Sequence, residues 1–327
     1  MPTKNLQLTS NFITIVIVNY RTAQLTINCL HSLVEEVAKI PQTSVVIVDN
    51  NSGDASIDQI QGVINSKGWQ SWASVIASPR NGGFAYGNNL AIGEALALKF
   101  PPNYFFLLNP DTVVHPGALE TLFQFMNEHP KVGIVGGRLE NADGAPQYSA
   151  FRFHSILSEL DSGLRLGIVS KLLDRWVVAP AISDVPCQTD WVSGANMMIR
   201  REVFETVGLL DEGYFMYYEE TDFCLQANKL DWSCWYLPDS RITHFVGQSS
   251  ESNRLKNSYK YVPQYWFDSR RRYFVKNHSV LYAATADISW FFGFLIWNLR
   301  KMITGEQGQK ANYFWLDFIR NSVIFKH

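Results

Sequence analysis

Two glycine signatures that mark common nucleotide-binding enzymes are missing from this sequence. The dinucleotide fingerprint GxGxxG would follow the first predicted strand, where Asn19-Tyr20-Arg21-Thr22 stands without a glycine. The phosphate-binding string GxxxxGK[ST] occurs nowhere in the chain. Dinucleotide-dependent and P-loop enzymes are therefore excluded, and a bound nucleotide would be held by loop side chains instead.

Cysteine and long apolar runs are also scarce. The four cysteines, Cys29, Cys187, Cys224 and Cys234, show neither a CxxC pair nor a metal-ligand spacing, which is typical of small buried side chains in a reducing compartment. The apolar run at Phe12–Val18 is too short for a signal peptide. The longest membrane-span candidate, Ser279–Trp297, contains Asp287, and its most apolar part is too short to cross a bilayer. We therefore expect a cytoplasmic protein.

The net charge of −2 argues against a general nucleic-acid binder, but the charge is unevenly distributed. Between Arg254 and Lys301 the chain carries nine basic residues and only two acidic ones, Asp268 and Asp287. Beside these charges lies the aromatic, uncharged stretch 288–297. This combination suggests an anionic membrane face as a partner. Packing on the catalytic part or on a partner subunit, which would make a homo-oligomer, is the alternative.

The first third of the sequence alternates strand and helix patterns. Residues 13–18 and 45–48 are continuous β-branched runs, as expected for strands buried on both faces of a parallel sheet. Apolar residues recur at helical spacing over 22–37 between them. A strand at 75–77, a helix at about 87–98 and a strand at 104–108 follow. The pattern predicts an α/β fold with a doubly wound, mostly parallel sheet.

Polar residues follow the predicted strands, and the ends of parallel strands share one crevice. Asn19 and Arg21 follow the first strand, Asp49 the second, and Asn109 and Asp111 the fourth. Further on, 191–199 reads as a strand broken by small residues, and 200–207 as a helix ended by Gly208. We expect a catalytic domain over 1–250, divided near 110 into nucleotide-binding and acceptor halves. Residues 247–259 read as a mobile loop or linker, and 251–327 as an aromatic, basic, helical appendage.

The stretch Tyr214–Phe223 concentrates acidic residues in an aromatic setting. It contains Glu219, Glu220 and Asp222, with Asp111 upstream and His244 downstream. Such a set suits metal-assisted group transfer, in which a carboxylate and an imidazole hold a cation and a second carboxylate removes a proton. Oxygen ligands favour Mg²⁺ or Mn²⁺ over zinc, and the histidine leans toward Mn²⁺.

Together these motifs resemble a known family, the family 2 glycosyltransferases, and within it the rhamnosyltransferase-like branch. The resemblance runs from about Thr14 to Val246 and is carried by IVIVNYRT, VVIVDNNSGD, NGGFAYGNNLAI, FFLLNPDTVV, VSGANMMIRREVFETVGLLDEGYFMYYEETDFCLQA and the later His244. It implies a GT-A type fold and an inverting transfer from a nucleoside-diphosphate sugar. By this resemblance Asp111 and His244 hold the metal, and Glu220 is the base, with Asp222 as the fallback. A glutamate at the base position departs from the family's usual aspartate.

The expected substrate contacts follow from the strand-end loops and from the resemblance. The donor set is Asn19, Arg21, Asp49, Asn81, Gly82, Gly83, Asn88, Asn89 and Asn109. The acceptor set is Trp191, Ser193, Gly194, Ala195 and Glu219. The resemblance implies L-rhamnose from dTDP-L-rhamnose as the donor and a glycan or lipid-linked glycan as the acceptor. With a lipid-linked acceptor, the protein would act on the inner face of the plasma membrane.

Two other functions stay open at this point. A nucleotidyltransferase would also place metal-binding acids on an α/β sheet, although it usually shows a glycine-rich, lysine-bearing loop after the first strand. An inactive sugar-nucleotide-binding module is conceivable because Asn109 and Glu220 depart from the common acidic motifs.

Overall fold

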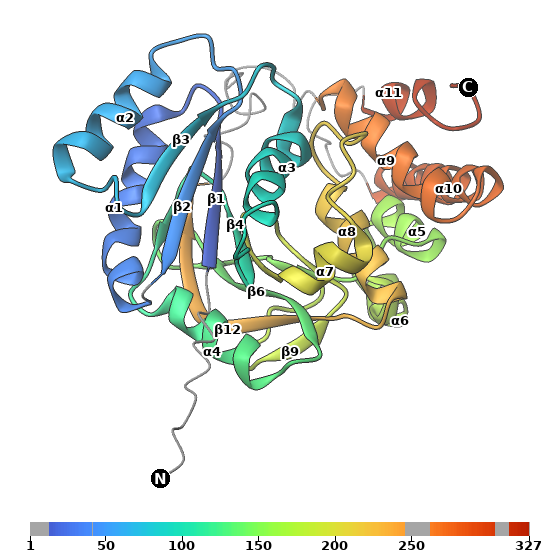
Figure 1. The fold of residues 1–327 in the computed structure, drawn as a ribbon. Coiled ribbons are helices and arrows are strands. Elements are labelled where there is room, and N and C mark those ends of the chain that lie inside the picture. Colours follow the sequence, from blue (N-terminus) through green and yellow to red (C-terminus); the bar gives the residue numbers. More distant parts are fainter. Residues whose placement is uncertain (1–12, 41, 246–261, 305–313, 327) are drawn as a thin grey trace.

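A mixed sheet forms the centre of the protein. The computed structural model describes residues 13–40, 42–245, 262–304 and 314–326. Its strands are β1 (Ile13–Asn19), β2 (Thr43–Asp49), β3 (Ala73–Ala77), β4 (Tyr104–Leu108), β5 (Thr112–Val114), β6 (Val132–Glu140), β7 (Pro146–Gln147), β8 (Ala150–Phe151), β9 (Cys187–Thr189), β10 (Trp191–Val192), β11 (Asn196–Arg200) and β12 (Ser233–His244). The described residues form a ten-stranded sheet with the main order β3-β2-β1-β4-β11-β6-β12-β5 (Figure 1).

Helices cover both faces of this sheet (Figure 1). Their bounds are α1 (Ala23–Lys39), α2 (Ser56–Lys67), α3 (Gly83–Leu96), α4 (Ala118–Glu128), α5 (Ile156–Leu164), α6 (Gly167–Leu172), the 3₁₀ turn Asp174–Trp176, α7 (Arg201–Val207), α8 (Glu219–Lys229), α9 (Gln264–Asn277), α10 (Val280–Thr304) and α11 (Phe314–Arg320). The predicted α/β fold is confirmed, and the predicted strands 13–18, 45–48, 75–77 and 104–108 all form.

Alternate residues of the central strands supply two separate cores. Ile13, Ile15 and Ile17 of β1 face the side covered by α1, α2 and α4. Val16, the intervening residue, faces the side covered by α3, α7 and α8. All four side chains are completely buried, and each contributes roughly 1.5–3 kcal/mol by leaving water. Burial on both faces explains why the strand sequence is apolar at successive positions.

The two halves of the sheet differ in strand direction. β1, β2, β3 and β4 are parallel neighbours. β11 joins β4 and β6 in antiparallel pairing, and β12 runs parallel to β6 but antiparallel to β5. The β12–β5 pair places His244 opposite Thr112, directly beside Asp111. The sheet topology therefore brings the two predicted metal ligands together.

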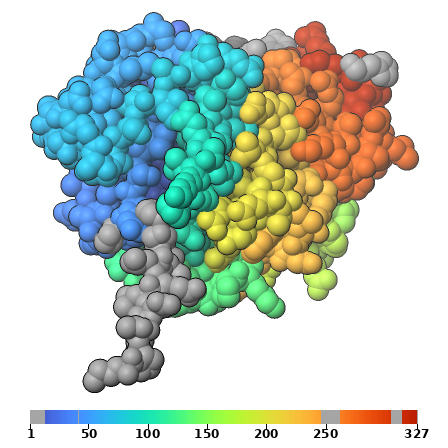
Figure 2. Space-filling model, in the orientation of Figure 1, coloured from blue at the N-terminus to red at the C-terminus, as the bar shows by residue number. Residues whose placement is uncertain are grey.

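The C-terminal helices pack beside α5 and α8 (Figures 1 and 2). α10 crosses α5 closely at Gly163 and Gly293, where an added Cβ on either glycine would collide with the backbone of the other helix. The buried guanidinium of Arg270 bridges α5 and α10 through Glu159 at 2.7 Å and Asp287 at 2.5 Å. The segment is helical, as predicted, and it shares a buried core with the catalytic part.

The four basic residues of α9 all form ion pairs with acidic side chains. Arg270 has the two partners named above, Arg271 pairs with Asp268, and Arg272 pairs with Asp211. Lys276 pairs with both Asp211 and Asp222. α9 therefore presents less free positive charge to solvent than its sequence suggests, because Glu159, Asp211 and Asp222 from earlier in the chain pair with three of its four bases.

Sequence reasoning misplaced or missed several elements. The third helix begins at Gly83, where Gly82 is the N-cap, and not near Gly87. The helices α2, α4, α5, α6 and α8 were not predicted. The break after Trp191–Val192 and the helix ended by Gly208 are confirmed. The predicted linker 247–259 lies outside the described residues.

Candidate active site

Asn19 and Asp49 lock together the carboxyl ends of β1 and β2. The Nδ2 of Asn19 donates to Oδ1 of Asp49 at 2.6 Å, and Ser52 Oγ donates to the same oxygen at 2.6 Å. The other carboxylate oxygen of Asp49 accepts from the backbone N–H of Ser52. Both Asn19 and Asp49 are buried. Both residues lie at strand ends, as expected, and their polar atoms are largely used to shape the loops.

Arg21 also fixes this pair of loops. Its φ of 57° is in the left-handed region, its backbone N–H donates to Ser52 Oγ, and its Nε donates to the carbonyl of Ser52. The guanidinium lies 5.1 Å from the centre of the Tyr20 ring. These contacts support a loop-organising role for Arg21.

The loop before α3 is tied to the aromatic motif that precedes α8. Phe84 N–H donates to the carbonyl of Phe215 at 2.9 Å. Gly83 has φ +85°, and a Cβ there would collide with that same carbonyl, so only glycine fits. The Nδ2 of Asn50 donates to Asn81 Oδ1 at 3.0 Å and to the carbonyl of Gly83 at 2.9 Å. The donor-side loops and the acidic motif thus form one structural unit.

Asn50 was missed by the sequence reasoning. Its side chain is buried, and its Oδ1 has no hydrogen-bond partner among the described residues. Buried carbonyl oxygens of this kind usually have a partner. Its position beside Asp49 at the end of a buried strand was the available signal.

Asn88 and Asn89 lie in the second turn of α3 and do not open it. Asn88 Nδ2 donates to the carbonyl of Phe84. Asn89 donates to the carbonyl of Leu210 and to Glu212, and its Oδ1 accepts from Leu210 N–H. Asn89 thus joins α3 to the segment that leads into α8.

Asp111 and His244 form the pair predicted to hold a metal. Asp111 Oδ1 lies 3.5 Å from His244 Nε2, and the aspartate side chain is fully buried. A carboxylate oxygen and an imidazole nitrogen facing one another at this distance fit two ligands of one divalent cation. Among the described residues no group of three or more His, Cys, Asp and Glu side chains could hold a metal.

The start of α8 is strained and densely acidic. Tyr217 and Tyr218 have φ values of 70° and 68°, a conformation that costs roughly 1–2 kcal/mol for each such residue. The helix begins immediately afterwards with Glu219 and Glu220. In both carboxylates one oxygen, Oε2, is buried without a hydrogen-bond partner in the described parts of the chain. Strain of this kind often accompanies functional sites.

Burial raises the pKa of both glutamates. For Glu219 the burial is reinforced by the charge of Glu220 next to it. For Glu220, which is half-buried, the backbone N–H groups of Glu220 and Gly194 counteract part of the rise. A raised pKa brings a carboxylate closer to the range in which it exchanges protons efficiently near neutral pH.

Gly194 packs directly beside Glu220. A Cβ on Gly194 would lie 3.8 Å from Glu220 Cβ and 3.0 Å from the ring of Phe84. Its neighbours are held by backbone bonds, with Ser193 N–H donating to Ser149 O and Asn109 N–H donating to Ala195 O. The predicted small-residue floor is therefore next to the predicted base and joined to Asn109.

Trp191 and Asp222 are occupied by structural contacts. The Trp191 ring stacks on Phe151 with centroids 4.2 Å apart, and its Nε1 donates to the carbonyl of Arg152. Asp222 is buried and accepts from Lys276 Nζ and Asn277 Nδ2, each at 2.6 Å. Trp191 thus behaves as a packing residue. Asp222 anchors α8 to α9, whereas Glu220 keeps an unpartnered oxygen among the described residues.

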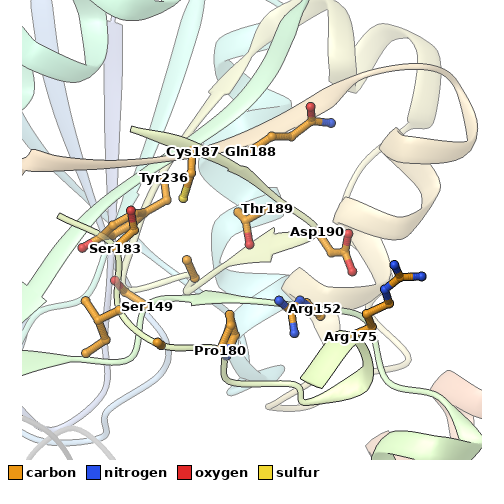
Figure 3. A pocket seen from close by; sticks show the side chains of 13 residues that line it. Ser149, Arg152, Arg175, Pro180, Ser183, Cys187, Gln188, Thr189, Asp190 and Tyr236 are labelled. Atoms are coloured by element: carbon orange, nitrogen blue, oxygen red, sulfur yellow. The ribbon is translucent and has the colours of Figure 1, made fainter. Parts of the chain in front are cut away.

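A cavity of about 470 Å³ is lined by residues from 149–152, 175–190 and Tyr236. Figure 3 shows Ser149, Ser183 and Tyr236 on one side of it and Asp190, Arg152 and Arg175 on the other. The hydroxyls of Ser149 and Tyr236 are buried and have no partner among the residues described, and burial raises the pKa of Tyr236 to about 12. Ser149 connects this cavity to the Gly194 segment, because its carbonyl accepts a hydrogen bond from the backbone N–H of Ser193.

Residues 14–208, more than half of the chain, match the profile described as Glycosyl transferase family 2. The chain is 26% identical over 267 residues to the low-salt glycan biosynthesis hexosyltransferase Agl10 of Haloferax volcanii, covering 81% of this chain and 75% of the relative. It is 25% identical over 223 residues to the N-acetylglucosaminyl-diphospho-decaprenol L-rhamnosyltransferase of Mycobacterium tuberculosis, covering 63% and 68%.

A solved structure with the same fold is the mannosyltransferase PcManGT of Pyrobaculum calidifontis, in complex with GDP-Man and Mn²⁺. The TM-score is 0.52 at 12% identity, and the alignment covers 96% of this chain and 85% of the mannosyltransferase. This likeness shows that the fold is of the GT-A type.

Proposed function

Because the chain belongs to glycosyl transferase family 2, we propose that it is an inverting glycosyltransferase in which Glu220 is the general base. The observation that carries this proposal is the position of Glu220. It lies in the first turn of α8 beside Gly194, its pKa is raised by burial, and one of its oxygens lacks a partner among the described residues. A carboxylate in that state can accept the proton of an acceptor hydroxyl.

Loss of this proton makes the acceptor oxygen the nucleophile. It attacks the anomeric carbon of the donor sugar, the bond to the nucleoside diphosphate breaks, and one displacement inverts the anomeric configuration. The proton stays on Glu220, whose buried surroundings favour the neutral carboxyl.

Asp111 and His244 are the residues that would hold a divalent cation, Mg²⁺ or Mn²⁺. Bound there, the cation would neutralise charge on the diphosphate leaving group. The 3.5 Å approach of the two side chains supports this assignment.

We assign the donor to the crevice at the ends of β1, β2 and β4. Asn109, Asn50 and the loop Asn81–Gly83 would contact it, while Asn19, Arg21 and Asp49 hold the loops in shape. We leave Asn88 and Asn89 out of the contact set because their amides bond within the fold. The sugar proposed is L-rhamnose from dTDP-L-rhamnose, in line with the named activity of the mycobacterial relative.

The acceptor is placed across Ser193, Gly194 and Ala195, with Glu219 beside the base. From there a glycan would extend past Ser149 into the 470 Å³ cavity of Figure 3. Buried hydroxyls together with Asp190, Arg152 and Arg175 offer the mixture of donors and acceptors that sugar hydroxyls require. A glycan or lipid-linked glycan fits this arrangement.

A membrane surface is the further partner that we propose, bound through α10. In the described part of the chain α10 is the one helix long and apolar enough to cross a membrane. Its inner face packs on α5, however, and its outer face carries a stripe of exposed side chains at helical spacing: Leu281, Ile288, Phe292, Leu295, Leu299 and Met302. Arg300 and Lys301 adjoin the end of this stripe, as expected for a helix lying on an anionic bilayer.

Vesicle co-sedimentation with point variants tests the membrane proposal without disturbing the core. Removing the C-terminal helices would also remove Arg270 and Lys276, which pair with the buried carboxylates of Glu159 and Asp222. Truncation is therefore unsuitable. A double variant, Ile288→Glu with Phe292→Glu, should lose binding to phosphatidylglycerol vesicles at low salt, whereas Leu98→Glu on an unrelated exposed site should keep it. Dimerisation lost in the same double variant would instead make the stripe an interface between copies.

Incubation with a panel of nucleotide sugars and Mn²⁺ tests the proposed activity. A glycosyltransferase releases nucleoside diphosphate and passes the sugar to an acceptor or to water. A nucleotidyltransferase would form pyrophosphate from a nucleoside triphosphate and a sugar phosphate. An inactive module would show a thermal shift with a nucleotide sugar and no turnover.

A further inference from the structure

Gln147 contacts both the imidazole and the backbone of His244. Its Oε1 lies 3.3 Å from His244 Nδ1, and its Nε2 donates to the carbonyl of His244 at 2.8 Å. The same Nε2 donates to Asn141 Oδ1 at 2.9 Å. Sequence reasoning did not single out this residue.

These contacts determine where the imidazole carries its proton. The carbonyl of His244 can only accept, so the end of the Gln147 amide that faces it must be the NH₂ group. The other end is then the carbonyl oxygen, which also can only accept. Nδ1 of His244 must therefore donate. When the ring is neutral, Nε2 presents its lone pair toward Asp111, 3.5 Å away.

The local sequence holds Gln147 in this position. Gln147 pairs with Leu139 in the β6–β7 hairpin. Its turn closes through hydrogen bonds from Asn141 N–H to Ala145 O at 2.8 Å and from Gly144 N–H to Asn141 O at 2.9 Å. Gly144 has φ 81°, which suits glycine. The hairpin thus presents Asn141 and Gln147 together to the end of β12.

We propose that Gln147 is a positioning residue that fixes the tautomer and orientation of His244 for metal binding. This inference rests on the proposed function, in which Asp111 and His244 hold a divalent cation. Metal-binding histidines commonly donate their second ring N–H to a fixed acceptor, and loss of that acceptor typically lowers metal affinity about 10–100-fold. Gln147 is not itself a proposed ligand, and its Oε1 supplies such an acceptor to Nδ1 of His244.

Mn²⁺ affinity, measured by electron paramagnetic resonance on the full chain, tests the proposal. Gln147→Leu keeps the size of the side chain but removes the acceptor, and should weaken Mn²⁺ binding by about 10–100-fold. Gln147→Glu keeps an acceptor for Nδ1 but loses the donor to the His244 carbonyl, and should bind Mn²⁺ more tightly than Gln147→Leu does. Asp143→Ala loosens the same turn at an exposed site, where Asp143 accepts from Ala145 N–H, and should bind Mn²⁺ as the wild type does.

The tautomer itself gives a second readout that needs no metal. Nitrogen NMR of ¹⁵N-histidine-labelled protein, with the resonances assigned through His244→Gln, should show His244 protonated at Nδ1 and a shifted tautomer population in Gln147→Leu. A neutral His244 protonated at Nε2, or equal Mn²⁺ affinity in wild type and Gln147→Leu, would overturn the role of Gln147. Failure of the wild type to bind Mn²⁺ would overturn the metal assignment instead, and the NMR result would then decide on Gln147.

Discussion

Asp222 and Lys276 form an ion pair of 2.6 Å that joins the helix carrying Glu220 to the C-terminal helices. The aspartate side chain is buried, and Asn277 donates to its other oxygen. Lys276 also pairs with Asp211, which precedes the strained tyrosines before α8. The C-terminal helices thus support the position of the proposed base.

Lys276→Met should destabilise the fold and slow turnover together. It leaves a buried carboxylate with a weaker set of partners, which costs roughly 1–3 kcal/mol in the free energy of unfolding. Denaturant unfolding measures the loss. Arg271→Met, which breaks a more exposed pair with Asp268 on the same helix, should cost less than about 1 kcal/mol. Equal losses in the two variants would contradict the anchoring role of Asp222.

Glu219→Gln should make the protein more stable at pH 8 while having little effect at pH 4. The pKa of Glu219 in the folded protein is raised above the ordinary value of 4.5 by burial and by the charge of Glu220. Above 4.5 the unfolded chain releases its proton before the folded protein does, so stability falls as pH rises through the folded pKa. The amide removes this loss. Unfolding curves at both pH values check the prediction, and a variant that is less stable at pH 8 would contradict it.

Asp111→Asn should abolish turnover while the protein stays folded. The substitution keeps the shape of the side chain and removes the charge that would hold the cation beside His244. Circular dichroism and the thermal midpoint control for folding, and nucleoside diphosphate release measures turnover. Wild-type activity in this variant would show that the metal site is elsewhere.

Alkylation of Cys187 should block acceptor use and spare donor binding. Cys187 lines the cavity of Figure 3 and is partly exposed, whereas the other three cysteines are buried. A bulky maleimide adduct would fill the proposed glycan path. We expect transfer to glycan to fall while the thermal shift with the donor is unchanged, and Cys187→Ala should be insensitive to the reagent. Unimpaired transfer by the fully labelled protein would place the glycan elsewhere.

The strand ends were predictable because strands buried on both faces of a parallel sheet are apolar at successive positions of their sequence. β1, β2 and β4 could be read directly, and with them the positions of Asn19, Asp49 and Asp111. The pairing of Asp111 with His244 was expected only through the family resemblance, since it depends on the β12–β5 register.

Contacts between distant segments could not be read from the sequence. Asn89 bonds to Leu210, Asp222 to Lys276 and Gln147 to His244. The two residues of each pair are more than 50 positions apart in the chain, so no local sequence pattern predicts the contact. For the same reason Asp222 and Glu220 could not be told apart by spacing. The basic residues of α9 likewise looked free, although Glu159, Asp211 and Asp222 pair with three of them.

The most direct test of the central claim is the comparison of Glu220→Gln with Asp222→Asn, using the wild-type donor and acceptor. The amide at 220 keeps the shape of the side chain but cannot take the proton. We predict that Glu220→Gln lowers kcat by about 10²–10⁴-fold with little change in donor affinity. Asp222→Asn should be less stable and keep a working base. An active Glu220→Gln beside an inactive, folded Asp222→Asn would contradict the account and move the base to Asp222.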